Sequence, residues 1–206
     1  MTPEAPRIAV FAKAPQPGEV KTRLVPLLGA EGAARLHENL VQHALATAIQ
    51  VHPSSFDLWC APDAAHPFFA RCATRFACQL RVQSGGELGE RMSNAFAASA
   101  PLVLIGSDCP ALTPAHLEQA WRALGSHDAA IAPAQDGGYV LIALARPQPA
   151  LFETMSWSGR DVMAETRRRI AKAGLKCLEL ESLWDVDRPE DYRRLERTGL
   201  AAEVQG

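Results

Sequence analysis

The chain has 206 residues, of which 48% are hydrophobic and 21% are charged, and its formal net charge at neutral pH is −2. This length fits one domain with a sizeable core, and this composition excludes an intrinsically disordered protein. The slightly acidic balance argues against a general binder of nucleic acids or anionic membranes, because those partners require a strong positive field. Any anionic ligand must therefore meet a local cluster of cations.

Strand-like and helix-like patterns alternate along the chain. Short apolar runs predict strands at residues 7–13, 56–61, 79–83, 101–108, 129–134, 139–145 and 175–180. Apolar spacing and helix-start signals predict helices at residues 31–51, 87–98, 113–124, 158–172 and from 187 onward. The last three helices begin at residue types that favour an N-cap, which are Thr113, then Ser158 with Asp161, and Asp187.

The alternation of strands and helices predicts the fold class. Several strands are apolar throughout, which is typical of a mostly parallel sheet covered by helices on both faces. Two neighbouring strands, at 129–134 and 139–145, break strict alternation, so we expect one antiparallel strand in a single α/β domain over residues 1–206. Ligands of such sheets bind outside the carboxyl ends of the strands. The loops to consider are therefore 13–23, 83–90, 106–113, 135–138 and 184–190.

The N-terminal region has no segment typical of secretion or membrane insertion. Its longest apolar run covers residues 8–12, whereas a secretory signal needs about 7–15 apolar residues and a membrane span about 20. The cysteines are odd in number and form no C-x-x-C pair, so we expect neither a disulfide framework nor a structural zinc site. These features predict a cytoplasmic protein without a membrane span.

The first loop places three cations within eleven residues, directly after the first strand. Lys13, Lys21 and Arg23 can provide point-charge and forked contacts to phosphate oxygens, and Gly18 permits close backbone approach. The loop lacks the glycine spacing of a P-loop. Its position at a strand end favours a phosphate-binding loop over the alternative, a solvated basic loop.

Acidic residues follow the most hydrophobic strand and recur near the C-terminus. Asp108 ends the strand at 101–108, where a charge is costly unless it is paired or holds a cation. Mg²⁺ needs few protein oxygens, because it retains waters and takes other ligands from substrate phosphates. The second carboxylate would come from Asp187 or Asp185, and the sequence leaves this choice open. The alternatives are a turn-forming role for Asp108 and a purely capping role for Asp187.

Two glycine-rich turns give weaker signals. Gln83, Gly85 and Gly86 precede a helix and could contact an anion or a base through exposed backbone N–H groups, although a plain turn fits equally well. Asp136, in the turn at 135–138, is the candidate general base, with a simple hairpin turn as the alternative.

Other reactive side chains lack a supporting pattern. Cys109 has no histidine placed beside it by the sequence, so a nucleophilic role is disfavoured. His37 and His43 lie on the first predicted helix without a metal-binding motif, and we expect both to be surface or satisfied groups.

The polar segments together resemble the nucleotide-diphospho-sugar transferase superfamily, in its bacterial glycosyltransferase A-like branch. The resemblance covers residues 7–195 and is carried by the motifs at 11–24, 106–112, 136–139 and 185–191. It implies a GT-A fold, a Rossmann-like three-layer α/β/α sandwich with one antiparallel strand.

The resemblance also implies roles for individual residues. Lys13, Lys21 and Arg23 would contact phosphates, Asp108 would bind the metal, and Asp187 or, less securely, Asp185 would add the second acidic group. Glycosyltransferases of this fold usually carry Asp-x-Asp, where this chain has Gly106-Ser-Asp108. The motifs at 108–110 and 185–191 look more like those of nucleotidyltransferases, such as the molybdenum-cofactor guanylyltransferases.

We therefore expect a transferase that depends on Mg²⁺ or Mn²⁺. It would bind a nucleotide sugar or a nucleoside triphosphate and transfer a glycosyl or nucleotidyl group to a small acceptor. Lys21, Asp108 and Asp136 are the expected catalytic residues, and the three cations of the first loop slightly favour a triphosphate. The alternative is a nucleotide-binding regulatory domain without turnover, which would not need the acidic residues. The acceptor and the oligomeric state stay open.

Overall fold

The computed structural model describes residues 7–52, 55–157 and 160–201, and the strands in these ranges form one sheet. The strands are β1 (Ile8–Lys13), β2 (Phe56–Ala61), β3 (Gln79–Val82), β4 (Leu102–Ile105), β5 (Ala129–Pro133), β6 (Tyr139–Leu144) and β7 (Cys177–Glu179). Their order across the sheet is β3-β2-β1-β4-β6-β5-β7. Strand β6 runs antiparallel to β4 and β5, and the other pairs are parallel. The prediction of a mostly parallel sheet with one antiparallel strand is confirmed.

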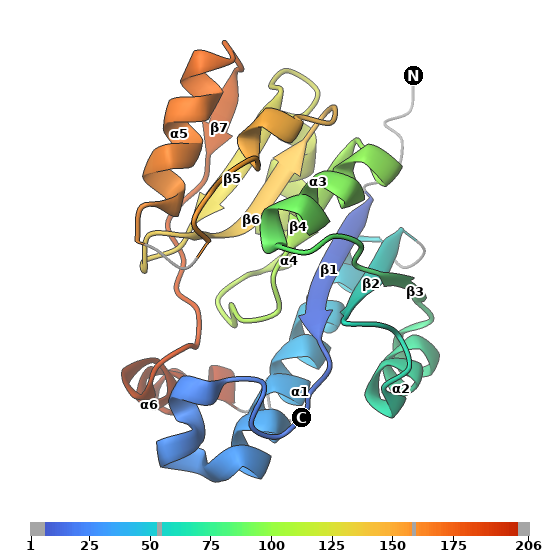
Figure 1. Cartoon of the computed structure of the whole chain (residues 1–206), viewed down its shortest axis with the longest axis vertical. Helices are drawn as coiled ribbons and strands as arrows, with labels where there is room; N and C mark the ends of the chain where they lie inside the picture. Colours follow the sequence, from blue (N-terminus) through green and yellow to red (C-terminus); the bar gives the residue numbers. More distant parts are fainter. Residues whose placement is uncertain (1–6, 53–54, 158–159, 202–206) are drawn as a thin grey trace.

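Helices cover both faces of this sheet (Figure 1). They are α1 (Val25–Val51), α2 (Pro67–Phe76), α3 (Leu88–Ser99), α4 (Pro114–Ala123), α5 (Val162–Lys172) and α6 (Pro189–Arg197). Helices α1, α2 and α4 share one apolar cluster with the sheet, and α3 and α5 share another on the opposite face. The three-layer α/β/α architecture expected from the resemblance is therefore confirmed. None of the helices in the described ranges is long and apolar enough to cross a membrane.

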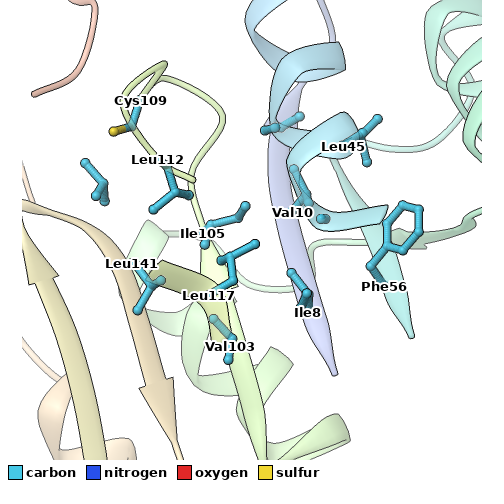
Figure 2. Packing of buried hydrophobic residues seen from close by; sticks show 14 of the residues in the cluster. Ile8, Val10, Leu45, Phe56, Val103, Ile105, Cys109, Leu112, Leu117 and Leu141 are labelled. Carbon is cyan, nitrogen blue, oxygen red and sulfur yellow. The ribbon is translucent and has the colours of Figure 1, made fainter. Parts of the chain in front are cut away.

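The central strands are buried on both faces, which is why they read as continuous apolar runs. In β4, Val103 and Ile105 belong to the cluster under α1 and α4, whereas Leu102 and Leu104 belong to the cluster under α3. Figure 2 shows Val103 and Ile105 beside Leu117 of α4. Burial of apolar surface on both faces of the sheet holds β4 at the centre of the fold.

A third apolar cluster lies beyond the end of the sheet and joins α6 to the first half of α1 (Figure 1). Its members are Leu24, Ala33, Leu36, Leu40, Trp184, Val186 and Leu195. This packing brings the segment before α6 close to the loop that follows β1. Two regions more than 160 residues apart in the sequence thus meet at one end of the molecule.

The sequence did not predict α2. This helix begins at Pro67, and the ring nitrogen Nδ1 of His66 accepts a hydrogen bond from the Phe68 N–H at its start. Histidine is an uncommon N-cap residue, so the usual start signal is missing. The apolar stripe that buries the helix, with Phe69, Cys72 and Phe76, was nevertheless present in the sequence.

Two predicted helix starts differ from the structure. Helix α1 starts at Val25 rather than at residue 31, with a kink at Gly29. The prediction that Asp187 caps the terminal helix is wrong, because the N-cap of α6 is Arg188. The carboxylate of Asp191 accepts the N–H groups of Arg188 and Asp187, at 2.8 and 3.2 Å. This arrangement leaves the Asp187 side chain available for another partner.

Of the remaining predicted caps, Ser158 lies outside the described residues. Asp161 is the N-cap of α5 and makes no side-chain capping hydrogen bond. Thr113 is the N-cap of α4, as predicted, with Pro114 as the first helical residue.

The turn between β5 and β6 packs tightly against the segment before α5. Gly137 has a φ of 100°, and a Cβ atom at this position would lie 2.0 Å from the carbonyl oxygen of Arg160. Its own carbonyl accepts a hydrogen bond of 2.8 Å from Met163 N–H. The turn therefore admits no side chain at position 137.

We expect Gly137→Ala to destabilise the protein by about 3 kcal/mol, since it combines positive-φ strain with a backbone clash. Gly174→Ala is the matched control, because its φ is 65° but a Cβ there would meet nothing within 4 Å. The control should lose only about 1 kcal/mol. Urea unfolding of both variants measures the difference, and equal losses would contradict the close packing of the turn.

Candidate functional site

A cavity of about 810 Å³ opens at the end of the sheet where β4 ends. Its wall includes Phe11 of β1, the loop after β4, the β5–β6 turn and parts of the segment at 184–191. Trp157, Arg160 and Val162 also line it. This is the location expected for a ligand site in an open α/β sheet. Among the site residues expected from the sequence, those that line the cavity are Arg23, Asp108, Asp136, Asp185 and Asp187.

Lys21 and Asp108 form an ion pair at the edge of this cavity. The Nζ atom of Lys21 lies 2.8 Å from Oδ1 of Asp108 and donates a hydrogen bond of 2.6 Å to the carbonyl oxygen of Val186. The Lys21 side chain is only 4% exposed, whereas that of Asp108 is 46% exposed. The ammonium group is thus enclosed by the protein, and the carboxylate faces both the lysine and the cavity.

Lys21 reaches this position from an unusual backbone conformation. Its φ of 49° and ψ of 39° are in the left-handed region, which costs a non-glycine residue about 1 kcal/mol or more. Such strain persists only where the surroundings hold the residue firmly, and it is frequent at functional sites. Here the two hydrogen-bonded partners of the ammonium group provide that restraint.

The surroundings of Asp108 favour its ionised form. Burial alone would raise the pKa of this carboxyl, but the charge of Lys21 and hydrogen bonds from Lys21 and Ser107 together hold it below its usual value. Asp108 is therefore a carboxylate at neutral pH. It can pair with a cation, whether that cation is Lys21 or a metal ion.

Two further contacts join the same segments. The guanidinium group of Arg23 forms an ion pair with the Asp187 carboxylate. The backbone N–H of Val186 donates to the carbonyl oxygen of Asp108 at 2.8 Å. The loop after β1, the loop after β4 and the segment before α6 are thus connected to one another by side-chain and backbone contacts.

His37 lies beside this ion pair. It is 5% exposed, its Nε2 lies 3.0 Å from the carbonyl oxygen of Lys13, and its Nδ1 lies 3.9 Å from Oδ1 of Asp108. Burial lowers the pKa of His37 despite the nearby carboxylate, so the ring is neutral. A carbonyl oxygen can only accept, so Nε2 carries the proton and Nδ1 is a buried acceptor that lacks a hydrogen-bond partner.

The expectation that His37 is a surface or satisfied group is therefore wrong. The sequence did contain a signal for its burial. His37 stands at helical spacing from the buried residues Ala33 and Val41, and thus on the face of α1 that packs against the sheet. His43, in contrast, has its Nε2 3.2 Å from the carbonyl oxygen of Pro110.

Asp136 and Asp185 also line the cavity, and neither forms an ion pair in the described part of the chain. The Oδ1 atom of Asp136 accepts a 2.9 Å hydrogen bond from Gly138 N–H and so closes the β5–β6 turn. Asp185 is half-buried, and burial together with the negative charges of Asp136 and Asp108 raises its pKa to about 6. Asp136 and Asp185 therefore bring acidic groups to this side of the cavity.

The other expected nucleotide contacts do not line the cavity. Lys13 and Gly18 are exposed. The side-chain amide of Gln83 is buried and donates to the carbonyl oxygens of Ala12 and Trp59, at 3.3 and 2.7 Å.

The glycine-rich turn after β3 is engaged in contacts with α3. Gly86 N–H donates to the carboxylate of Glu90 at 2.7 Å, and Arg91 donates to the carbonyl oxygens of Gly85 and Gly86. A nucleotide-binding role for this turn, and for Lys13, Gly18 and Gln83, stays a prediction.

The donor set fits a hard cation that is shared with a substrate. Within the described residues, no group of three or more His, Cys, Asp or Glu side chains is arranged to hold a metal ion. Mg²⁺ commonly takes one or two carboxylates and completes its shell with waters and phosphate oxygens. Asp108 with Asp185 or Asp187 matches that requirement. Cys109 does not contribute a thiolate, because burial raises its pKa to about 12.

The comparisons with known proteins agree with this architecture. A family model described as "Uncharacterized protein conserved in bacteria (DUF2064)" matches residues 44–159. A 1.90 Å crystal structure from Desulfovibrio desulfuricans G20, of a protein named provisionally as a nucleotide-diphospho-sugar transferase, is 34% identical. It superposes with a TM-score of 0.84 over 95% of this chain and 88% of that chain. The comparison with curated proteins gives no match.

Two more distant structures share the fold. A cytidylyltransferase from Leptospira borgpetersenii is 14% identical, with a TM-score of 0.61 over 93% of this chain and 85% of that chain. A 4-diphosphocytidyl-2C-methyl-D-erythritol synthase from Anaerococcus prevotii is 12% identical, with a TM-score of 0.60 over 98% of this chain and 97% of that chain.

The raised pKa of Asp185 predicts a pH-dependent effect of Asp185→Asn on stability in metal-free buffer. In the folded chain this carboxyl has a pKa of about 6, above the value of about 3.9 in an unfolded chain. The ionised carboxylate therefore costs stability above pH 6, and this cost falls as the pH decreases towards 4.

We expect the variant to exceed the wild type by about 1–2 kcal/mol at pH 8, after allowance for partial exposure, and by about half as much at pH 5. Urea unfolding at both pH values measures this difference. Glu31→Gln, at an exposed position on α1, is the control and should show no such trend. A variant less stable than the wild type at pH 8 would contradict the assignment.

Proposed function

Since this chain belongs to the DUF2064 family, within the nucleotide-diphospho-sugar transferase superfamily, we propose that it is a metal-dependent transferase that uses a nucleotide diphosphosugar and transfers the glycosyl group to a small acceptor. The observation that carries this proposal is the Lys21–Asp108 ion pair at the end of β4. It places a cation from the loop after β1 against an acid that faces a large cavity.

The donor would bind where the loop after β1 meets Asp108. A diphosphate brings several negative charges, which Lys21 and Arg23 can neutralise. These two cations are paired with Asp108 and Asp187, so another positive charge must first neutralise the two carboxylates. A divalent cation held by Asp108 with Asp185 or Asp187 would provide that compensation and neutralise phosphate oxygens of the donor. The lysine ammonium would then be available to stabilise the charge that develops on the leaving diphosphate.

The relative at 34% identity favours a diphosphate donor over the triphosphate that the three cations of the first loop slightly favoured, because it is named for a nucleotide diphosphosugar. Nucleotidyl transfer is the second candidate, because the Asp108-Cys-Pro110 motif resembles that of nucleotidyltransferases.

In glycosyl transfer, the acceptor oxygen would attack the sugar carbon that carries the diphosphate. The bond between this carbon and the phosphate oxygen breaks, and the nucleoside diphosphate leaves with the electron pair. The proton of the acceptor hydroxyl must pass to a base. Asp136 and Asp185 both line the cavity and supply a carboxylate for that purpose.

We expect a nucleotide sugar with Mg²⁺ to raise the melting temperature by about 5–10 °C at a hundredfold excess over its Kd. The probes are UDP-glucose, GDP-mannose and ADP-glucose against the four nucleoside triphosphates, each with Mg²⁺ or with EDTA. Stabilisation by a triphosphate alone would replace glycosyl transfer with nucleotidyl transfer. The absence of stabilisation by every probe would contradict both.

Asp108→Asn should reduce hydrolysis of the stabilising nucleotide sugar by about 10²–10³-fold, since it removes the charge that holds the cation. Release of the nucleoside diphosphate measures this reaction without knowledge of the acceptor. Asparagine retains an acceptor oxygen for Lys21, so the stability loss should stay within about 1–3 kcal/mol.

Arg168→Ala is the control for this measurement. Arg168 pairs with Glu165 on the exposed side of α5 and should leave the rate unchanged. Full activity of Asp108→Asn would contradict the metal assignment. A measured affinity for nucleotide sugars with no turnover in the wild type would instead favour the regulatory domain.

A further inference from the structure

The cavity extends from Asp108 towards an aromatic wall. Trp157 stacks on Phe152, with ring centroids 6.3 Å apart and an interplanar angle of 27°. Phe152 in turn stacks on Phe96 at 5.7 Å and 11°, and Tyr139 meets Trp157 edge-on at 6.4 Å and 89°. Phe96 and Phe152 are buried in the core, so they support the indole ring from behind. Trp157 itself lines the cavity.

The neighbouring helix leaves room for this indole ring. A Cβ atom at Gly89 of α3 would lie 2.6 Å from two atoms of the Trp157 ring and 2.6 Å from the carbonyl oxygen of Phe152. Any side chain at this position would displace the indole. Leu88 and Met92 of the same helix also line the cavity, and they extend the apolar wall.

Acidic side chains also line this cavity. Asp136 and Asp185, which we call the Asp136–Asp185 edge, form no ion pair within the residues that the structure describes. On the aromatic side of the cavity, the hydroxyl of Tyr139 donates a hydrogen bond to the Sδ atom of Met92 at 3.8 Å. A thioether is a weak acceptor, so this hydroxyl is available to a better partner.

The sheet order separates this region from the donor side. The loop after β1 supplies Lys21 and Arg23, and β1 and β6 lie on opposite sides of β4. If the donor phosphates bind at this loop, the space over β6 is left for the second substrate.

The described lining of the cavity contains more acidic than basic residues. The acidic residues are Asp108, Asp136, Asp185, Asp187 and Asp191, and the basic residues are Arg23, Arg160 and Arg188. This excess of negative charge disfavours a phosphorylated acceptor.

We propose that the space between Trp157 and the Asp136–Asp185 edge is the acceptor subsite, and that it takes an uncharged sugar-like ring. The apolar C–H face of such a ring packs against an aromatic face, whose quadrupole attracts the polarised C–H groups. Ring hydroxyls donate strong hydrogen bonds to carboxylates, and a ring oxygen can accept from Tyr139. This inference depends on the proposed function, because it assumes that the donor occupies the loop after β1.

The test is saturation-transfer difference NMR on the full chain with its nucleoside diphosphate and Mg²⁺. The probes are the methyl pyranosides of glucose, galactose and mannose, and methyl ribofuranoside. Trp157→Ala should weaken binding of the preferred probe at least tenfold, whereas Trp157→Phe, which keeps a flat ring, should weaken it less than threefold. The control is Trp121→Phe on α4, which packs against the core outside the cavity lining and should leave the affinity unchanged.

A second measurement, thermal stabilisation by the nucleotide sugar, separates a failure of the acceptor inference from a failure of the proposed function. Stabilisation by the nucleotide sugar should be the same in Trp157→Ala as in the wild type, which also shows that the variant is folded. Nucleotide binding without binding of any of the four probes would overturn the acceptor inference and leave the proposed function intact. Binding of glucose 6-phosphate or free nucleosides in preference to the neutral rings would also overturn it. No stabilisation by any nucleotide would overturn the proposed function and this inference with it.

Discussion

The ion pair between Lys21 and Asp108 is the interaction on which the geometry of the cavity depends. A buried lysine is costly unless its charge and its N–H groups find partners. Lys21 meets this requirement through two segments at once, by contacts to the Asp108 carboxylate and to the Val186 carbonyl. The loop after β1 can therefore adopt its conformation only when the end of β4 and the segment before α6 are in place. Packing of α6 on α1 holds the segment before α6 in place. Trp184 and Val186 of this segment and Leu195 of α6 share one apolar cluster with Leu36 and Leu40 of α1.

Much of the fold was predictable because the local sequence of the central strands alone indicates that they are buried. Residues 102–105 are four consecutive apolar side chains, and they are buried on both faces of the sheet, as that pattern requires. The location of the cavity followed from the same reasoning, since the polar residues after such a strand must lie at its carboxyl end. Asp108, Asp136 and the acidic segment at 184–191 could therefore be placed near one another before any coordinates were known.

At the candidate site, the main errors concern contacts between distant parts of the chain. Asp187 has the residue type and the position of an N-cap, but its side chain pairs with Arg23, which lies 164 positions earlier. No local pattern could reveal that Asp187 pairs with Arg23 instead of capping the helix. The burial of Lys21 could not be predicted for a similar reason: a loop rich in proline and glycine gives no local signal for burial, and only tertiary packing encloses the lysine. His37 is a different case, because the periodicity of α1 did indicate its buried face, and only the neighbouring Asp108 required the fold.

The antiparallel course of β6 has a consequence for how this architecture can diversify. Because β6 runs against β4, it begins at the cavity, and the short turn at 135–138 delivers Asp136 there directly. The loop that carries Lys21 and Arg23 belongs to β1, on the other side of the central strand. Under the proposed function, a few substitutions in this one hairpin would change the acceptor preference and leave the proposed donor side of the sheet as it is.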